Sequence, residues 1–100
     1  MAHTVIKLDD LRRNRPAILA AAARRGAHDL RVFGSVASGT ATAESDVDLV
    51  ARFGPERSLL DLGGLKADLE DLLGCPVDVL SEKGLRPEFR EAVLRQAVAL

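Results

Sequence analysis

The sequence contains no tryptophan and no tyrosine, and its only aromatic residues are three phenylalanines. Proteins that hold single-stranded nucleic acid stack the bases on aromatic side chains, so this mode of binding has almost no support here. The net charge is −1, which gives no electrostatic basis for binding a phosphate backbone. We therefore expect no direct nucleic-acid partner.

Cysteines and long apolar runs are also scarce. Cys75 is the only cysteine, so no disulfide can form within the chain, and a reducing, cytoplasmic compartment fits. The N-terminus lacks the apolar stretch of a signal peptide, and the run Ala20–Ala23 is too short to span a bilayer. We expect a cytoplasmic protein with no membrane partner.

The composition is that of one globular domain, which we expect to cover residues 1–100. Of the 100 residues, 47% are hydrophobic and 29% are charged. Apolar runs typical of strands occur at Leu30–Phe33, Asp46–Phe53 and Pro76–Leu80. Helical patterns precede, separate and follow them, so the sequence predicts a layered α/β domain with about three strands and about four helices.

The helical patterns leave one boundary open. Pro16 lies inside the first pattern, so either the main helix begins near Pro16 or a single helix kinks there. The later patterns predict two buried faces. In the middle helix this face holds Leu59, Leu62, Leu65, Leu69, Leu72 and Leu73, and in the last helix it holds Phe89, Ala92, Val93, Ala97 and Leu100. The arginines of the last helix, Arg86, Arg90 and Arg95, are either solvated or meet an acidic partner surface.

Three aspartates stand where strands are expected. Side chains alternate between the two faces of a strand, so Asp46 and Asp48 point the same way while Val47 and Leu49 face the core. Asp78 lies in the third predicted strand, and all three carboxylates converge if that strand lies beside the second. Such a cluster is costly without a cation, and oxygen ligands suit Mg²⁺, so we expect a divalent metal held by these aspartates.

A glycine and a serine end the first predicted strand. Gly34 and Ser35 lead into a short helical turn whose backbone N–H groups and hydroxyl suit a phosphate. Each feature has a simpler interpretation when taken singly. Gly34–Ser35 can be an ordinary turn, and the three aspartates can be solvent-facing strand residues.

Together, Gly34-Ser35, Asp46-x-Asp48 and a later strand aspartate resemble the nucleotidyltransferase superfamily related to DNA polymerase beta. The short chain and the run Ser-Asp-Val-Asp-Leu are most similar to the minimal nucleotidyltransferase antitoxins. The resemblance covers about Leu8 to Leu100. It implies the single-domain nucleotidyltransferase fold, with a small mixed sheet.

The resemblance also implies a reaction. Members of the family bind ATP with Mg²⁺, transfer AMP and release pyrophosphate. In the antitoxin branch the acceptor is a tyrosine of a partner HEPN-domain toxin, so a hetero-oligomer is expected. Carried over to this sequence, Gly34 and Ser35 hold the β- and γ-phosphates, and Asp46 and Asp48 ligate Mg²⁺, with two ions expected. Asp78 holds the catalytic metal and helps to activate the acceptor hydroxyl.

One position departs from the family pattern. Many antitoxin-type members carry arginine where this sequence has Ser38, which we also assign to nucleotide binding. A hydroxyl can hydrogen-bond a phosphate but cannot neutralise it, so Arg31 or Arg52 is a candidate replacement. Two alternatives stay open. The protein can neutralise its toxin by docking without catalysis, or it can be the subunit of a small-molecule nucleotidyltransferase of the antibiotic-modifying type.

Overall fold

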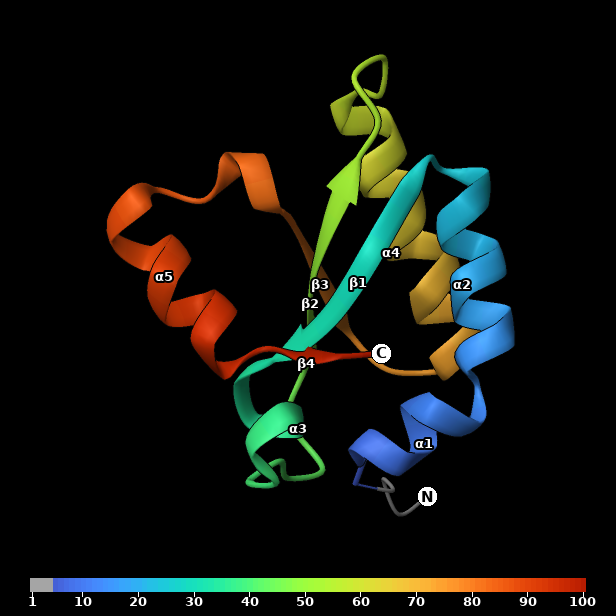
Figure 1. The fold of residues 1–100 in the computed structure, drawn as a ribbon. Coiled ribbons are helices and arrows are strands. Elements are labelled where there is room, and N and C mark those ends of the chain that lie inside the picture. Colours follow the sequence, from blue (N-terminus) through green and yellow to red (C-terminus); the bar gives the residue numbers. More distant parts are fainter. Residues whose placement is uncertain (1–4) are drawn as a thin grey trace.

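A four-stranded mixed sheet forms the centre of the computed structural model, which describes residues 5–100 (Figure 1). The strands are β1 (Ala27–Phe33), β2 (Val47–Phe53), β3 (Val77–Ser81) and β4 (Val98–Ala99), in the order β3-β2-β1-β4. β2 runs antiparallel to β1 and parallel to β3, and β4 runs antiparallel to β1. The predicted mixed α/β architecture is confirmed, with one strand more than expected.

Within residues 5–100, five α-helices and one 3₁₀ turn precede or connect these strands. They are α1 (Leu8–Arg13), α2 (Arg15–Arg24), α3 (Gly34–Ser38), α4 (Leu59–Leu73), the turn η1 (Glu82–Gly84) and α5 (Pro87–Gln96). Pro16 lies in the first turn of α2, where its missing N–H costs nothing, so the main helix begins there and is not kinked. Within residues 5–100, none of the helices has the length and apolar character needed to cross a membrane.

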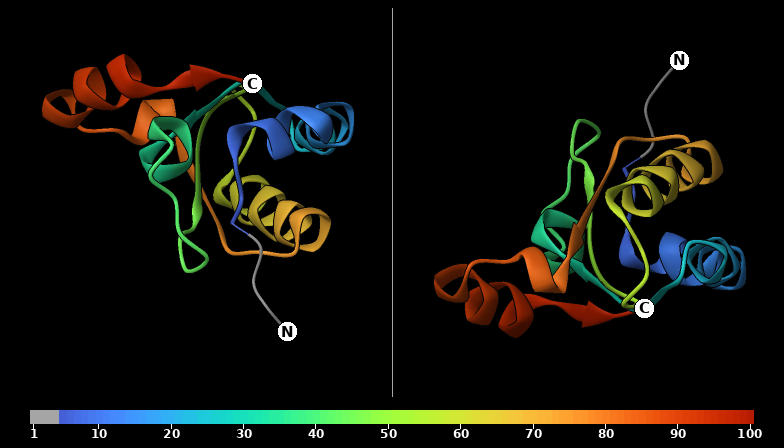
Figure 2. Two further views of the ribbon diagram at one scale, coloured as in Figure 1. Left: turned by 90° about the horizontal axis from the view of Figure 1, so that it is seen from below. Right: turned by 90° about the horizontal axis from the view of Figure 1, so that it is seen from above.

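The core lies between one face of the sheet and the helices α2 and α4. Both views in Figure 2 show α1, α2 and α4 on one side of the sheet and α3 and α5 on the other. Ile18 of α2 and Leu65 and Leu69 of α4 are fully buried in this core. The predicted leucine face of α4 was wrong at two positions, since Leu59 is 85% exposed and Leu72 is 40% exposed, whereas Leu62 and Leu73 are partly buried against the core.

The end of the chain differs from the prediction. α5 ends at Gln96 and contains no buried residue, and Phe89, expected on its inner face, is 58% exposed. Beyond the helix the chain extends, pairs with β1, and buries Leu100, whose N–H donates to the carbonyl of Leu30 at 3.1 Å. Pairing covers the otherwise open edge of β1, which outweighs continuation of the helical pattern.

A buried glutamate attaches α5 to the open face of the sheet. Glu82 is 3% exposed and accepts hydrogen bonds from three arginines. These are Arg31 of β1 at 2.9 Å, Arg52 of β2 at 2.6 and 3.2 Å, and Arg90 of α5 at 3.1 Å. The hydrogen bond from Arg52, together with Arg90 and Arg31, lowers the pKa of Glu82 to about 2. The cluster thus links α5 to the two neighbouring strands β1 and β2.

This cluster predicts how stability depends on pH. Because the pKa of Glu82 is lowered on folding, its ion pairs contribute fully above the unfolded value near 4.5 and are lost as pH falls towards 2. We expect Glu82→Gln to lower the free energy of unfolding at pH 7 by about 2 kcal/mol. The difference from wild type should shrink below pH 4.5 in urea titrations followed by circular dichroism.

A matched control is available on α5. Glu91 also pairs with an arginine, Arg95, but both side chains are exposed at 79% and 73%, so Glu91→Gln should leave stability nearly unchanged. Equal effects of the two substitutions would contradict the role given to Glu82.

Candidate active site

Two aspartates stand side by side on the open face of the sheet. β2 and β3 pair in parallel with Asp48 opposite Asp78. Val47 and Val77, their neighbours in the two strands, are fully buried on the helix-covered face. Because strand side chains alternate, Asp48 and Asp78 project from the opposite face. The third predicted strand therefore does lie beside the second, and it brings Asp78 next to Asp48.

Asp46 joins this pair from the loop that enters β2. It lies just before the strand begins and its side chain is exposed, whereas Asp48 is half-buried. Burial raises the pKa of the Asp48 carboxyl, and the negative charges of Asp78 and Asp46 raise it further. The three carboxylates are thus near enough to repel one another, which is the condition that a bound cation relieves.

A lysine approaches the third aspartate from α4. Lys66 Nζ lies 3.8 Å from Asp78 Oδ1, donates to the carbonyl of Val77 at 2.7 Å, and lies 3.3 Å from Glu70 Oε2. Glu70 in turn accepts from the N–H of Val77 at 3.2 Å, which lowers its pKa. These two side chains fix the start of β3, from which Asp78 projects.

The carboxylate oxygens of the aspartates suit a divalent metal, although the three side chains do not all point towards one common position. Among residues 5–100, no group of three or more His, Cys, Asp or Glu side chains is arranged to hold a metal ion as it stands. Asp46 and Asp78 are exposed, so their side chains can turn towards Asp48 without disturbing the core. Three carboxylates supply the oxygen ligands that Mg²⁺ prefers. The residues present therefore fit the metal, and its binding stays a prediction.

Gly34 packs directly against the Asp48 carboxylate. Its φ of +72° lies in the left-handed region, and a Cβ placed on it would lie 2.5 Å from Asp48 Oδ2. Any other residue would be strained and would displace the carboxylate. The glycine predicted to contact phosphate thus also sets the position of the central aspartate.

Ser35 and Ser38 lie at opposite ends of α3. Ser35 is half-buried in the first turn, where backbone N–H groups have no partner within the helix. Ser38 is exposed in the last turn, where its hydroxyl donates to the Ser35 carbonyl at 3.3 Å and lies 2.8 Å from Thr40 Oγ1. The first position suits the predicted phosphate contact. At Ser38 the hydroxyl is engaged with its own loop.

The candidate replacements for the missing cation are engaged elsewhere. Arg31 and Arg52 lie on the same face of the sheet as Asp48, but both donate to Glu82. The structure therefore does not support either as a substitute for a cation at Ser38. Glu82 and Lys66 were missed by sequence reasoning. The only sequence signal for Glu82 was the period-two spacing of a strand. Glu82 stands four residues after Asp78, and it lies two residues beyond Leu80, where the strand was predicted to end.

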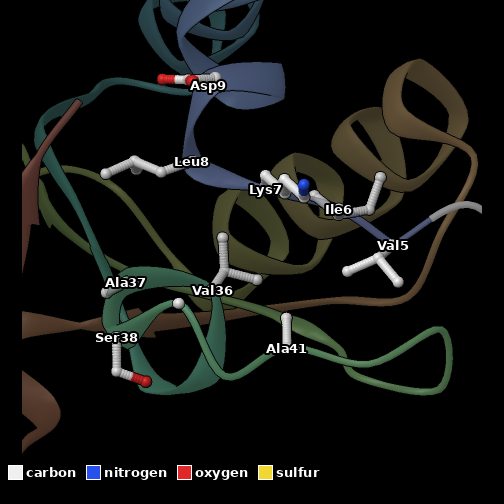
Figure 3. A pocket seen from close by; sticks show the side chains of 10 residues that line it. Val5, Ile6, Lys7, Leu8, Asp9, Val36, Ala37, Ser38 and Ala41 are labelled. Atoms are coloured by element: carbon white, nitrogen blue, oxygen red, sulfur yellow. The ribbon is translucent and has the colours of Figure 1, made fainter.

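A separate hollow borders α3. It has a volume of about 330 Å³ and lies between the segment Val5–Asp9 and the residues of α3 and its following loop (Figure 3). Val36, Ala37 and Ala41 line it from the side of α3, and in Figure 3 the Val36 side chain points towards the segment Val5–Asp9. None of the three aspartates lines it, so it is distinct from the carboxylate cluster.

Comparison with known proteins decides the family. The nucleotidyltransferase domain family matches residues 18–100. The chain belongs to this family. It is also 39% identical over 75 residues to the protein adenylyltransferase MntA of Thermococcus cleftensis, covering 75% of this chain and 76% of that protein.

Solved structures agree with the observed fold. A structure described as a "putative minimal nucleotidyltransferase" is 52% identical, with a TM-score of 0.86 over 95% of this chain and 97% of the other. A toxin-antitoxin crystal structure with AMP-PNP is 19% identical, with a TM-score of 0.75 over 86% of this chain and 71% of the other, and shows a shared fold. The chain is thus a nucleotidyltransferase with the predicted nucleotidyltransferase fold.

The contact between Gly34 and Asp48 yields a prediction for metal binding. We expect Gly34→Ala to weaken Mn²⁺ binding, measured by isothermal titration calorimetry, at least about tenfold, because the new Cβ displaces the Asp48 carboxylate. Gly39→Ala is the matched control. Its φ is +77°, yet nothing lies within 4 Å of its Cβ position.

Both variants carry a similar backbone strain of about 1–2 kcal/mol. Both should therefore lose stability, and only Gly34→Ala should lose metal affinity. If the two variants bound Mn²⁺ equally well, Gly34 would have no role in placing Asp48.

Proposed function

We propose that this nucleotidyltransferase uses Mg²⁺ and ATP to transfer AMP to a tyrosine hydroxyl of a partner HEPN-domain toxin, and that it acts as the antitoxin of the pair. The observation that carries the proposal is the pairing of Asp48 with Asp78, with Gly34 packed against Asp48. The single cysteine supports a reducing, cytoplasmic location for the protein.

The names of similar proteins support the choice of acceptor. The Thermococcus relative is a protein adenylyltransferase. The structure with AMP-PNP is a toxin-antitoxin complex, and a mutant MntA-HpeT toxin-antitoxin complex has the same fold, at 18% identity and a TM-score of 0.68. A hydroxyl on a partner protein is therefore favoured over one on a small molecule.

Each residue of the site has a role in this reaction. The N–H groups at Gly34 and Ser35 bind the β- and γ-phosphates, and Asp46, Asp48 and Asp78 hold the metal. When bound, Mg²⁺ offsets phosphate charge and makes the acceptor hydroxyl more acidic. The acceptor oxygen attacks the α-phosphorus and forms the new O–P bond. The bond between the α-phosphorus and the oxygen that bridges to the β-phosphate breaks, and pyrophosphate leaves. Asp78, the more exposed aspartate of the paired strands, receives the hydroxyl proton.

One observation favours a second function. The hydroxyl of Ser38 bonds to Ser35 and Thr40, and no cation stands at this position. A non-catalytic antitoxin, which neutralises its toxin by docking, can tolerate a low affinity for nucleotide. The two functions differ in whether neutralisation needs the aspartates.

The decisive substitution is Asp48→Asn. It keeps the shape of the side chain but removes the charge that faces the metal, so we expect transfer of label from α-labelled ATP to the toxin to fall by about 100-fold or more. Asp71→Asn, which changes an exposed carboxylate of α4, should leave labelling unchanged. Labelling is read on a denaturing gel, and neutralisation from growth of cells that express the toxin.

The outcomes separate the two functions. Loss of both labelling and neutralisation in Asp48→Asn supports the adenylyltransferase. Neutralisation that persists without label supports the docking antitoxin. Undiminished labelling by Asp48→Asn would overturn the assigned reaction centre.

A further inference from the structure

Positive charge is in excess at the end of the open sheet face that lies away from the aspartates. Arg31, Arg52 and Arg90 surround the buried carboxylate of Glu82. Arg52 also lies 3.8 Å from Asp29, which is half-exposed. Lys83, next to Glu82 in the chain, adds a fourth cation. The four cations exceed the two carboxylates, which leaves the group with a net positive charge.

This group of charges borders a hollow. The hollow, which we call the basic hollow, has a volume of about 260 Å³. It is lined by His28, Arg52, Phe53, Glu82, Lys83 and Arg90. Arg52 and Arg90 are each about half-exposed, at 51% and 49%, while Glu82 is buried. Arg90 contacts Glu82 through Nη2 alone, so its other guanidinium N–H groups are available at the mouth. The surface can therefore pair with a further anionic group.

The basic hollow shares one face of the sheet with the reaction centre. Arg52 follows Asp48 by four residues in β2, so alternation places both on this face, about 13 Å apart along the strand. Leu80 lies on the same face of β3, two residues after Asp78, and is 39% exposed. This face thus carries carboxylates at one end, an exposed leucine between, and surplus arginines at the other end.

We propose that the basic hollow receives carboxylate side chains of the protein acceptor and thereby brings the acceptor hydroxyl to Asp78. This inference rests on the proposed function, because it requires a protein acceptor. An acceptor that bridges both ends must span about 13 Å, which suits a folded protein surface. The phosphates of the nucleotide belong to the opposite end, at Gly34 and Ser35. Complementary charge at such a surface speeds encounter and fixes orientation.

The test uses a cation that lines the hollow without holding Glu82. Lys83 is exposed and makes no ion pair among residues 5–100, so Lys83→Glu should leave the fold intact. We expect the KM for the toxin to rise about tenfold at low salt, with kcat and the KM for ATP unchanged. Lys83→Gln should give a smaller rise. Both differences should shrink as salt is added, because exposed charges are screened.

Arg95→Glu is the matched control, since it makes the same change of charge on an exposed arginine of α5 outside the hollow. Its KM for the toxin should equal that of wild type. If Lys83→Glu behaves like Arg95→Glu while wild type labels the toxin, the basic hollow is not the docking surface. If Lys83→Glu instead raises the KM for ATP, a nucleotide phosphate occupies the hollow and the inference is overturned. If wild type itself does not label the toxin, the proposed function fails, and this inference fails with it.

Discussion

The parallel pairing of β2 with β3 is the constraint on which the rest of the site depends. It places Asp48 opposite Asp78, and alternation turns both away from the core. The register is held by the buried valines and leucines on the other face, against which α4 packs. A slip of one residue would turn the aspartates into the core. The packing that stabilises the domain therefore also creates the carboxylate cluster.

The surroundings of the three aspartates favour the binding of a cation. Asp48 is half-buried, has two aspartates as neighbours, and packs against the backbone of Gly34. Lys66 approaches only Asp78, from the edge of the sheet, and is engaged with Val77. Arg31 and Arg52, which lie on the same face, donate to Glu82. The protein thus separates its acidic and basic groups along one face, which leaves the carboxylates without a full internal counter-charge.

Local rules predicted much of this arrangement. Period-two alternation predicted that Asp48 and Asp78 point away from the core, because this depends only on backbone geometry near each residue. Their meeting was expected only if β3 lay beside β2, which the sequence did not decide, and Asp46 lies in the loop just before β2. The metal, the nucleotide and the acceptor came from the resemblance to a family. Ser58 caps α4 by a local contact, since its side chain accepts from the N–H of Leu60.

Non-local contacts explain what the sequence did not reveal. β4 is only two residues long, and it forms because β1 offers an open edge. The burial of Glu82 depends on three arginines far from one another in the chain. Phe89 follows a helical pattern, yet among the described residues no element covers it. Each outcome depends on which segments meet, which no local pattern encodes.

The most direct test of the account is the pKa of Asp48, measured by NMR from the titration of its carboxyl carbon with and without Mg²⁺. The account predicts a pKa above the ordinary aspartate value of 3.8 in the absence of metal, because burial and the charges of Asp78 and Asp46 oppose ionisation. Addition of Mg²⁺ should lower it, and so should the substitution Asp78→Asn. An ordinary pKa that neither Mg²⁺ nor this substitution shifts would show that the three carboxylates do not form one reaction centre.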